Sequence, residues 1–268
     1  CRSAAARQHW NIDAEQRHFD TYQSLSHDIA VSPEIFFAQL VPSMVGNESF
    51  YGEAWRMVDV RTRGLHNKVI AAAPFCDLSV FNVLVDRIPG GSDVHLANST
   101  PARYAQLFDR VRDIRWFSNR GTSGIDGCTS TAVGATFASK KTTTLITGDT
   151  AFCYDSNAFW NNHLSEHLRV IVVDNGGGNI FRVIEGPDKD PELLKWFEAP
   201  HTRNIEQLVN SFGLPYFYAD DQKGLLERMD ELYADHGKPA VLHIKTDGEL
   251  SPKVLREYFI KLKGGEKV

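Results

Sequence analysis

The sequence predicts an α/β fold, a doubly wound and mainly parallel six-stranded sheet with helices on both faces. Two observations carry this prediction. From about residue 91 onward, short apolar runs of strand length alternate with stretches of helical spacing, which is the order typical of a parallel sheet with crossover helices. The run Val-Ile-Val-Val at 170–173 is also apolar on both faces, as a strand covered by helices on both sides requires.

The first third of the chain lacks this alternation. Residues 1–31 are polar and rich in charge and histidine, and we interpret them as a linker or lead-in. Ser32-Pro33-Glu34 predicts a helix start, because Ser suits the N-cap, Pro the first helical position and Glu the first turn. Further helical segments are expected over 50–86, with breaks near Asn67 and Pro74.

The elements of the sheet follow in order. The expected strands are Val94–Ala97, Ile114–Phe117, Thr143–Thr147, Val170–Val173, Tyr216–Tyr218 and Val241–Lys245. The expected helices lie near 100–111, 126–138, 151–164, 204–212, 221–235 and 251–263. The predicted domain therefore covers 32–268, with leading helices over 32–90 and the core sheet over 91–268.

Composition narrows the class of protein. The 268 residues carry a formal net charge of -5, which argues against a nucleic-acid partner, since such a partner favours a basic excess. No apolar run has the length of a membrane span, and the N-terminus lacks the layout of a signal peptide. The four cysteines form no metal-ligand spacing, so we expect reduced thiols in a cytoplasmic protein without nucleic-acid or membrane partners.

The chemistry of a doubly wound sheet lies beyond the carboxyl ends of its strands. After the strand at 143–147 comes Gly148-Asp149-Thr150-Ala151. Gly148 permits a tight turn and close approach of a ligand. Asp149 stands where a helix begins and anions bind, so a divalent cation bridging this carboxylate to a phosphate is one interpretation, and a plain N-cap is the other.

The next strand ends in a second polar loop, Asp174-Asn175-Gly176-Gly177-Gly178. Asn175 lies 26 residues beyond Asp149 (175 minus 149), a spacing filled by one helix and one strand. If the two strands are neighbours, Asn175 offers a side-chain oxygen and a nearby glycine offers a carbonyl, both suited to Mg²⁺. A glycine-rich surface turn is the alternative interpretation of this loop alone.

The pair formed by Gly148-Asp149 and Asn175 resembles the GDG…N signature of thiamine-diphosphate (ThDP) dependent enzymes, with Thr150 in place of the third glycine. The resemblance implies ThDP as cofactor and Mg²⁺, or alternatively Mn²⁺, as its metal. The implied metal ligands are Asp149, Asn175 and the carbonyl of Gly177. The implied cofactor-binding residues are Gly148, Asp149, Thr150, Ala151, Ile125, Asn175, Gly177 and Gly178.

A more specific stretch is Ser118-Asn119-Arg120-Gly121-Thr122-Ser123-Gly124-Ile125-Asp126-Gly127. It resembles the SNRG-x-SGIDG motif of the 2-succinyl-5-enolpyruvyl-6-hydroxy-3-cyclohexene-1-carboxylate synthases of menaquinone biosynthesis. Asn98-Ser99-x-x-x-Arg103 and Asn179-Ile180-Phe181 resemble further segments of that family. The resemblance covers roughly residues 90–265.

This resemblance implies decarboxylation of 2-oxoglutarate and addition of the resulting succinyl carbanion equivalent to isochorismate, on ThDP as electron sink. Both substrates carry carboxylates, for which Arg103 and Arg120 are the matching partners. The implied substrate-binding residues are Ser99, Arg103, Arg120, Ile180, Phe181 and Ile184. Ser99 is interpreted equally well as an N-cap, and Ile180 and Phe181 as ordinary core. Ile125 would support the cofactor from below.

Enzymes of this family pair the diphosphate-binding domain with a pyrimidine-binding domain of a partner subunit, which supplies an activating Glu. No segment here matches that domain, so we expect the C-terminal part of a homodimeric or homotetrameric enzyme, without a catalytic residue of its own and inactive alone. The alternatives are the same domain of an acetolactate-synthase-like carboligase or decarboxylase, and a non-catalytic domain of the same fold. A Rossmann dehydrogenase is disfavoured, because no dinucleotide fingerprint is present.

Overall fold

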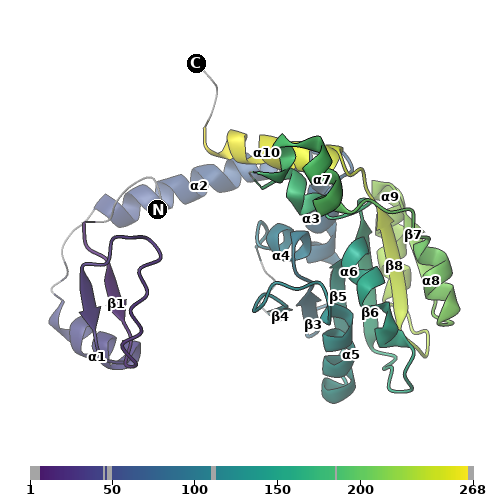
Figure 1. The fold of residues 1–268 in the computed structure, drawn as a ribbon, viewed down its shortest axis with the longest axis horizontal. Helices are drawn as coiled ribbons and strands as arrows, with labels where there is room; N and C mark the ends of the chain where they lie inside the picture. The colour runs from purple at the N-terminus through teal and green to yellow at the C-terminus, as the bar shows by residue number, and fades with distance from the viewer. Residues whose placement is uncertain (1–6, 45, 47–49, 110–112, 185, 265–268) are drawn as a thin grey trace. The chain divides into compact units, whose positions relative to one another are not determined.

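The structure is a computed structural model of the chain, and it describes residues 7–44, 46, 50–109, 113–184 and 186–264. The contacts divide the chain into two compact units, 1–58 and 59–268. The boundary between the units thus lies after residue 58, whereas we had placed the end of the lead-in at residue 31. Figure 1 shows the course of the chain and the labels used below.

The N-terminal unit contains a short parallel pair of strands that we did not predict. Strands β1 (Trp10–Ile12) and β2 (His27–Ile29) pair with Trp10 opposite His27. Each spans three residues, too short for an alternation pattern to be visible in the sequence. Helix α1 (Pro33–Ser43) begins as predicted, because the Ser32 side chain accepts a hydrogen bond from the Ile35 N–H.

Helix α2 (Phe50–Ala71) runs without interruption, so the predicted break near Asn67 is wrong. A single Asn lowers helix stability by only about 0.7 kcal/mol relative to Ala, which the rest of the helix outweighs. The predicted break near Pro74 is confirmed, since helix α3 (Asp77–Arg87) begins beyond it. Proline disfavours helical backbone in the residue before it.

The C-terminal unit contains the predicted six-stranded sheet, and every neighbouring pair of strands is parallel. The strands are β3 (Asp93–Leu96), β4 (Arg115–Ser118), β5 (Thr143–Gly148), β6 (Leu168–Asp174), β7 (Tyr216–Ala219) and β8 (Ala240–Lys245). Their order is β4-β3-β5-β6-β8-β7. After β3 the chain moves to one side of the sheet and after β5 to the other, so the topological switch point lies between these strands.

The helices around the sheet follow the predicted order with shorter ends. They are α4 (Thr100–Ala105), α5 (Cys128–Ser139), α6 (Asp149–Tyr154), α8 (Ile205–Ser211), α9 (Gln222–Leu232) and α10 (Leu250–Leu262). The helix expected near 151–164 was too long. It ends at Tyr154, and a 3₁₀ turn η1 (Ser156–Phe159) follows. The Asn161 side chain then donates to the Ala158 carbonyl and competes with continued helix. The helix expected near 100–111 ends at Ala105, and residues 110–112 lie outside the described part.

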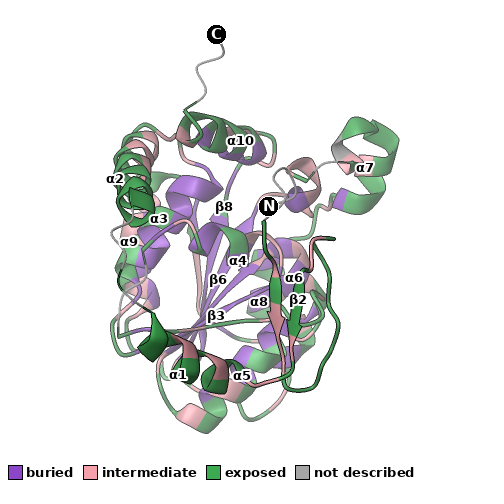
Figure 2. Ribbon diagram, turned by 90° about the vertical axis from the view of Figure 1, so that its left-hand side faces the viewer, coloured by how far each residue is buried: buried purple, intermediate pink, exposed green. Residues whose placement is uncertain are grey.

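Two apolar cores show that the sheet is covered on both faces. Ile171 and Val173 of β6 pack with residues of α3, α4, α9 and α10, whereas Val170 and Val172 pack with residues of α5, α6 and α8. Alternate residues of one strand thus enter opposite cores. In Figure 2 the buried residues concentrate on β3, β6 and β8. The predicted doubly wound fold is confirmed.

Cys76 and Cys128 are buried free thiols and Cys153 is partly buried, as expected for cysteines that fill small spaces. Within the described residues, no helix is long and apolar enough to cross a membrane.

Candidate functional site

A cavity of about 410 Å³ lies at the switch point of the sheet. Its wall includes all of the site residues predicted from the sequence: Ser99, Arg103, Arg120, Ile125, Gly148, Asp149, Thr150, Ala151, Asn175, Gly177, Gly178, Ile180, Phe181 and Ile184. These residues follow β3, β4, β5 and β6, so four separate strand ends supply one cavity. The predicted convergence of the two polar loops is therefore present in the fold.

The strand register explains why Asp149 and Asn175 meet. Gly148 at the end of β5 lies opposite Val173 of β6, so the loops that follow leave the sheet side by side. The Asp149 carboxylate accepts a hydrogen bond of 3.0 Å from the Gly176 N–H. Asp149 is the first residue of α6, and Gly148 occupies the N-cap position. The carboxylate thus bridges to the second loop, and the plain N-cap interpretation is not needed.

Two buried oxygen atoms in the cavity wall, Asn175 Oδ1 and Thr150 Oγ1, have no hydrogen-bond partner among the described residues. The Asn175 amide nitrogen, in contrast, donates to Asp77 Oδ2 at 2.9 Å. A buried polar atom without a partner costs about 1–3 kcal/mol. These two oxygens therefore fit a site completed by a cation and by the oxygens of a bound anion.

The glycine loop approaches a neighbouring segment closely. A Cβ on Gly177 would lie 2.6 Å from the Glu198 carbonyl oxygen, and the Gly177 φ is +151°, a value that L side chains rarely adopt. The Gly178 N–H donates to the same carbonyl at 2.6 Å. The Gly177 carbonyl accepts from the Asn179 N–H at 2.9 Å, and its second lone pair is available to a metal ion. This close packing explains why the loop contains glycine.

The segment 197–201, to which the sequence analysis gave no role, braces the site. Glu198 is buried and pairs with Arg182 through two hydrogen bonds, one of them 2.9 Å long. His201 Nε2 lies 3.1 Å from Asp149 Oδ2, an ion-pair contact. The segment follows helix α7 (Pro191–Glu198), whose first N–H groups are capped by the Asp190 side chain.

The electrostatic environment of Asp149 has opposing contributions. Burial raises the pKa of Asp149 above its usual value, and His201 acts in the opposite direction. The Asp149 carboxylate in turn raises the pKa of His201. Despite its burial, Asp174 has a pKa below its usual range, because His243 and Lys245 donate hydrogen bonds of 3.0 and 2.9 Å to it. A cation beside Asp149 would favour its ionised form.

The two predicted arginines belong to the part of the wall that follows β3 and β4. Arg120 donates a hydrogen bond to the Asn98 side-chain oxygen. The pKa of Arg103 is lowered mainly by its burial and, to a smaller extent, by the nearby positive charge of Arg120. Neither guanidinium pairs with a carboxylate in the part of the chain that the structure describes. Two cations without a carboxylate partner favour an anionic ligand.

Some predicted substrate-binding residues could also be helix caps or ordinary core residues, and their contacts bear on this choice. Ser99 occupies the N-cap position of α4 but makes no side-chain capping bond, and its φ of 79° is unusual for a non-glycine residue. Such backbone strain clusters at functional sites. Ile180 is buried, Phe181 packs against Phe197 with ring centroids 5.1 Å apart, and Ile184 is exposed at the rim. Three further lining residues, Asn98, Ser123 and Asn179, belong to the motifs quoted from the sequence but had no predicted role. The lining residues outside those motifs and outside the predicted site are Thr100, Pro101, Phe197, Glu198 and Ala199.

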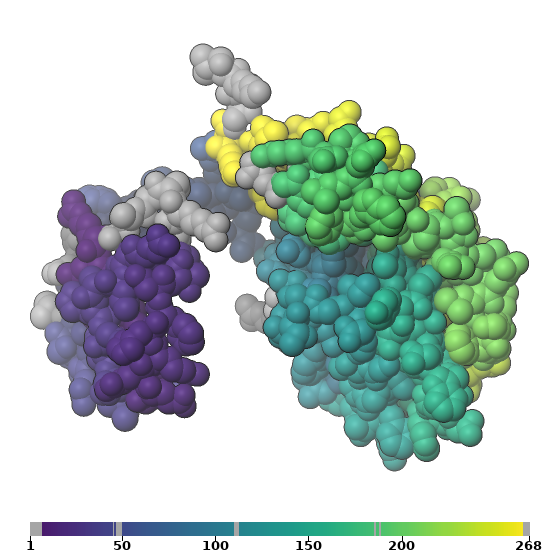
Figure 3. Space-filling view, in the orientation of Figure 1, coloured from purple at the N-terminus to yellow at the C-terminus, as the bar shows by residue number. Residues whose placement is uncertain are grey.

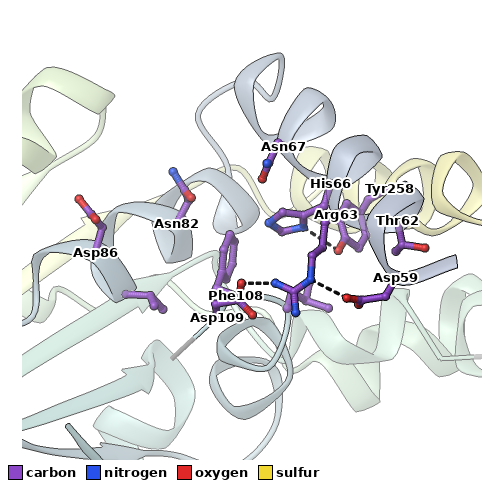
Figure 4. A pocket seen from close by; sticks show the side chains of 12 residues that line it. Asp59, Thr62, Arg63, His66, Asn67, Asn82, Asp86, Phe108, Asp109 and Tyr258 are labelled. Carbon is purple, nitrogen blue, oxygen red and sulfur yellow. Dashed lines mark hydrogen bonds and ion pairs between the residues drawn. The ribbon is translucent and has the colours of Figure 1, made fainter. Parts of the chain in front are cut away.

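A second cavity of about 450 Å³ lies among α2, α3 and α10, away from the strand ends (Figure 4). Arg63 pairs there with Asp59 and Asp109, and His66 hydrogen-bonds the Tyr258 hydroxyl at 3.0 Å. Arg63 in this cavity thus has carboxylate partners, unlike the arginines at the switch point. Within the described residues, no cluster of three His, Cys, Asp or Glu side chains could hold a metal. The predicted metal set has one carboxylate, one amide and one carbonyl.

The fold and the cavity define a class of protein: a parallel α/β domain with a polar, arginine-containing cavity at its topological switch point, where such folds bind their ligands. The family described as "Thiamine pyrophosphate enzyme, C-terminal TPP binding domain" matches residues 99–244. The chain belongs to this family of enzyme domains, and thiamine pyrophosphate is another name for ThDP.

Curated relatives agree with the resemblance found in the sequence. The chain is 39% identical over 257 residues to the 2-succinyl-5-enolpyruvyl-6-hydroxy-3-cyclohexene-1-carboxylate synthase of Flavobacterium psychrophilum, covering 96% of this chain and 46% of the relative. The same-named proteins of Flavobacterium johnsoniae and Porphyromonas gingivalis are each 36% identical, covering 95% and 98% of this chain and 46% and 47% of the relatives. The chain thus spans a little under half the length of these relatives.

Proposed function

We propose that this chain binds the diphosphate of ThDP through Mg²⁺, and that it is the cofactor domain of a synthase that decarboxylates 2-oxoglutarate and adds the succinyl unit to isochorismate in menaquinone biosynthesis. The observation that carries the proposal is the composition of the switch-point cavity. It combines a buried carboxylate, an amide oxygen and a glycine loop after β5 and β6 with two arginines after β3 and β4. Among the described residues, the amide oxygen has no hydrogen-bond partner and the arginines have no carboxylate partner.

The metal would be held by the Asp149 carboxylate, Asn175 Oδ1 and the Gly177 carbonyl, with Mn²⁺ as the alternative ion. All three donors are oxygens, the ligand type that Mg²⁺ prefers. Asp149 and Asn175 also fit because the first is a buried carboxylate and the second has an oxygen without a partner. Thr150 Oγ1 would donate to a diphosphate oxygen, and the backbone of Gly148, Ala151 and Gly178 would line the diphosphate.

When bound, ThDP supplies the reactive carbon and the electron sink for decarboxylation. The chain's own residues would bind and orient the reactants. Ile125 would support the cofactor ring, while Ile180 and Phe181, with Ile184 at the rim, would form an apolar wall that excludes water. Ser99 would contact substrate from the N-cap position of α4, the helix that contains Arg103. A dry wall strengthens the attraction between the arginines and substrate carboxylates.

Arg103 and Arg120 would hold the carboxylates of 2-oxoglutarate and isochorismate. Because they follow β3 and β4 while Asp149 follows β5, substrate charge is separated from the diphosphate charge. This arrangement favours substrates that carry several carboxylates over the smaller monocarboxylates of acetolactate-synthase-like enzymes. Neutralising either arginine, Arg103→Gln or Arg120→Gln, is expected to lower kcat/KM at least about tenfold, the cost of one charge-assisted contact.

The activity belongs to the whole enzyme, which we propose to be a cytoplasmic homodimer or homotetramer. The chain alone is expected to show no turnover, because the relatives are about twice its length. Turnover of both substrates by this chain alone at an enzymatic rate would contradict that expectation.

The decisive experiment is a calorimetric titration of the natural full-length protein with ThDP, with and without Mg²⁺, beside the variant Asp149→Ala. We expect ThDP binding that depends on Mg²⁺ and disappears in the variant, because Asp149 would be the charged ligand among the three proposed metal ligands. Wild-type binding that ignores both Mg²⁺ and the substitution would refute the metal-bridged site. Decarboxylation assays with 2-oxoglutarate and pyruvate then separate the proposed synthase from an acetolactate-type enzyme.

A further inference from the structure

Asp77 is a buried carboxylate that lies next to the candidate site but does not line it. It is the first residue of α3 and is 1% exposed. It comes 72 residues before Asp149 (149 minus 77), from an element that precedes the sheet. Burying a charged group without a purpose is costly, so its contacts indicate what it does.

The two carboxylate oxygens of Asp77 have different partners. Oδ1 accepts from the Thr246 hydroxyl at 2.6 Å and the Ser251 hydroxyl at 3.0 Å. Oδ2 accepts from the Asn175 amide nitrogen at 2.9 Å. The start of the 11-residue helix α3 adds favourable electrostatic potential for a carboxylate. Asp77 thereby joins α3 and the turn after β8 to the metal loop.

The contact to Oδ2 fixes which end of the Asn175 amide faces the cavity. An amide group has an oxygen end and a nitrogen end of nearly the same shape, and its hydrogen bonds determine the orientation. Because Asp77 Oδ2 accepts a hydrogen bond from the Asn175 amide N–H, the other end of the amide, Asn175 Oδ1, must point away from Asp77. That oxygen is the buried one without a partner in the cavity wall.

The backbone of Asn175 is held as well. A Cβ on Gly248 would overlap the Asn175 carbonyl oxygen, so the turn after β8 packs directly on this residue. Backbone and side chain are thus fixed by separate contacts. With the backbone in place, the amide can still rotate about its last torsion, and Asp77 restrains that rotation.

We propose that Asp77 is a positioning residue that holds the Asn175 amide with its oxygen toward the bound cation. The inference rests on the proposed function, because it assigns the cation to Asn175. Outer partners of this kind typically change metal affinity about 10–100-fold when they are removed. This orientation of the Asn175 amide does not depend on the protonation of Asp77. A proton on Oδ1 would be hydrogen-bonded to the Thr246 hydroxyl, and Oδ2 would still accept the hydrogen bond from the Asn175 amide N–H.

The test measures the affinity of the full-length protein for Mn²⁺ in the presence of ThDP, by the electron paramagnetic resonance signal of free Mn²⁺. Asp77→Ala is expected to weaken Mn²⁺ binding by about tenfold or more. The exchanged pair Asp77→Asn with Asn175→Asp is expected to bind within about threefold of wild type, because the new amide donates to the new carboxylate, whose second oxygen faces the cation. The matched control is Ser251→Ala, which removes one partner of Oδ1 and the acceptor of the Asp77 backbone N–H but keeps the contact to Asn175.

Each outcome separates the inference from the proposed function. Absence of Mn²⁺ binding by wild type, or binding unchanged in Asp149→Ala, refutes the proposed function itself. Wild-type binding that is lost in Asp149→Ala but unchanged in a folded Asp77→Ala overturns the role of Asp77. If Asp77→Ala does not fold, the exchanged pair decides, because a folded exchanged variant that fails to bind Mn²⁺ also overturns it.

Discussion

At the scale of single residues, Gly177 is the position with the least freedom in the site. Two features disfavour any side chain at this position. The φ of Gly177 is +151°, and an added Cβ would lie only 2.6 Å from the Glu198 carbonyl oxygen. The second obstacle is backbone, which cannot rotate aside as a side chain can. The loop that carries Asn175 and the Gly177 carbonyl would therefore have to move.

Gly177→Ala is expected to reduce Mg²⁺-dependent ThDP affinity by about tenfold or more, because a displacement of the loop misplaces two proposed metal ligands. Calorimetric titration measures it. The matched control is Gly134→Ala in α5, where an added Cβ meets nothing within 4 Å. That control should leave ThDP affinity unchanged and stabilise the fold by about 0.5–1 kcal/mol. Equal affinity of Gly177→Ala and wild type would contradict the close-packing argument.

Which site residues the sequence could predict follows from how each is positioned. Asp149 and Asn175 stand directly after apolar strands, so their place at the sheet edge can be read from the pattern. Asp77 could not be found, because a lone Asp at a helix start has the same appearance as a cap. Its contact to Asn175 arises from packing across 98 residues of chain, which no local pattern encodes.

At the scale of elements, strand positions could be predicted because buried parallel strands are apolar on both faces. Helix ends were less accurate, since they depend on side chains such as Asn161 that compete with the backbone. Helix α7 was missed although Asp190-Pro191-Glu192 is the same kind of start signal as Ser32-Pro33-Glu34.

The pairing of the edge strand β4 with β3 includes an ion pair that depends on pH. Arg115 donates two hydrogen bonds to Asp93, of 2.7 and 2.5 Å. Arg115 thereby holds the pKa of Asp93 below its usual value. A lowered folded-state pKa means that the unfolded chain binds more protons between the two pKa values. The pair therefore stabilises the fold above the ordinary pKa of Asp, about 4, and this contribution disappears as pH falls through the lower folded-state value.

Arg115→Gln is expected to lower the free energy of unfolding only modestly at pH 7, because the guanidinium is largely exposed and water screens the pair. The difference from wild type should shrink below about pH 4 as Asp93 is protonated. Urea unfolding at a series of pH values measures both quantities. A difference that stays constant down to about pH 2 would show that Arg115 acts through packing and not through the carboxylate.

The ion pair between Arg182 and Glu198 ties α7 to the 3₁₀ turn η2 (Asn179–Arg182) beside the site. Figure 1 shows α7 at the end of the sheet where α6 begins, and in Figure 3 this green segment stands over the teal region that contains β3 and α4. The same Glu198 contributes the backbone carbonyl that receives the Gly178 N–H. Stability of α7 and the shape of the glycine loop are therefore linked through one residue.

Glu198→Gln is expected to destabilise the fold by about 2 kcal/mol and to weaken ThDP binding, because the pair with Glu198 is largely buried and its loss leaves Arg182 only the more distant contact of 3.9 Å to the exposed Glu249. Urea unfolding and calorimetry measure the two effects. The comparison variant is Arg228→Gln in the exposed pair with Glu231 of α9, where a clearly smaller change in the free energy of unfolding is expected. Similar effects of the two substitutions would argue against a special role for α7.

At the scale of the whole molecule, the buried apolar residues are distributed unevenly along the chain. Both apolar cores are built from residues between Cys76 and Tyr258. In the described part of the first unit, residues 7–44, 46 and 50–58, no residue is buried. The short β1–β2 pair and α1 thus lack the buried apolar surface that folding requires, whereas the sheet unit contains its own.

A fragment beginning at Asp59 is therefore expected to keep the fold of the sheet unit, with a urea midpoint close to that of the whole chain. A fragment of residues 1–58 is expected to be unfolded in isolation, because two three-residue strands and one helix cannot offset the conformational entropy of ordering the chain. Circular dichroism and urea titration of the two fragments measure this. A cooperative unfolding transition in 1–58 would show a core that the described residues lack. A large loss of stability in the Asp59 fragment would show that the first unit supports the sheet. The unchanged midpoint is expected because every strand of the six-stranded sheet, and both cores that cover it, lie within the retained residues.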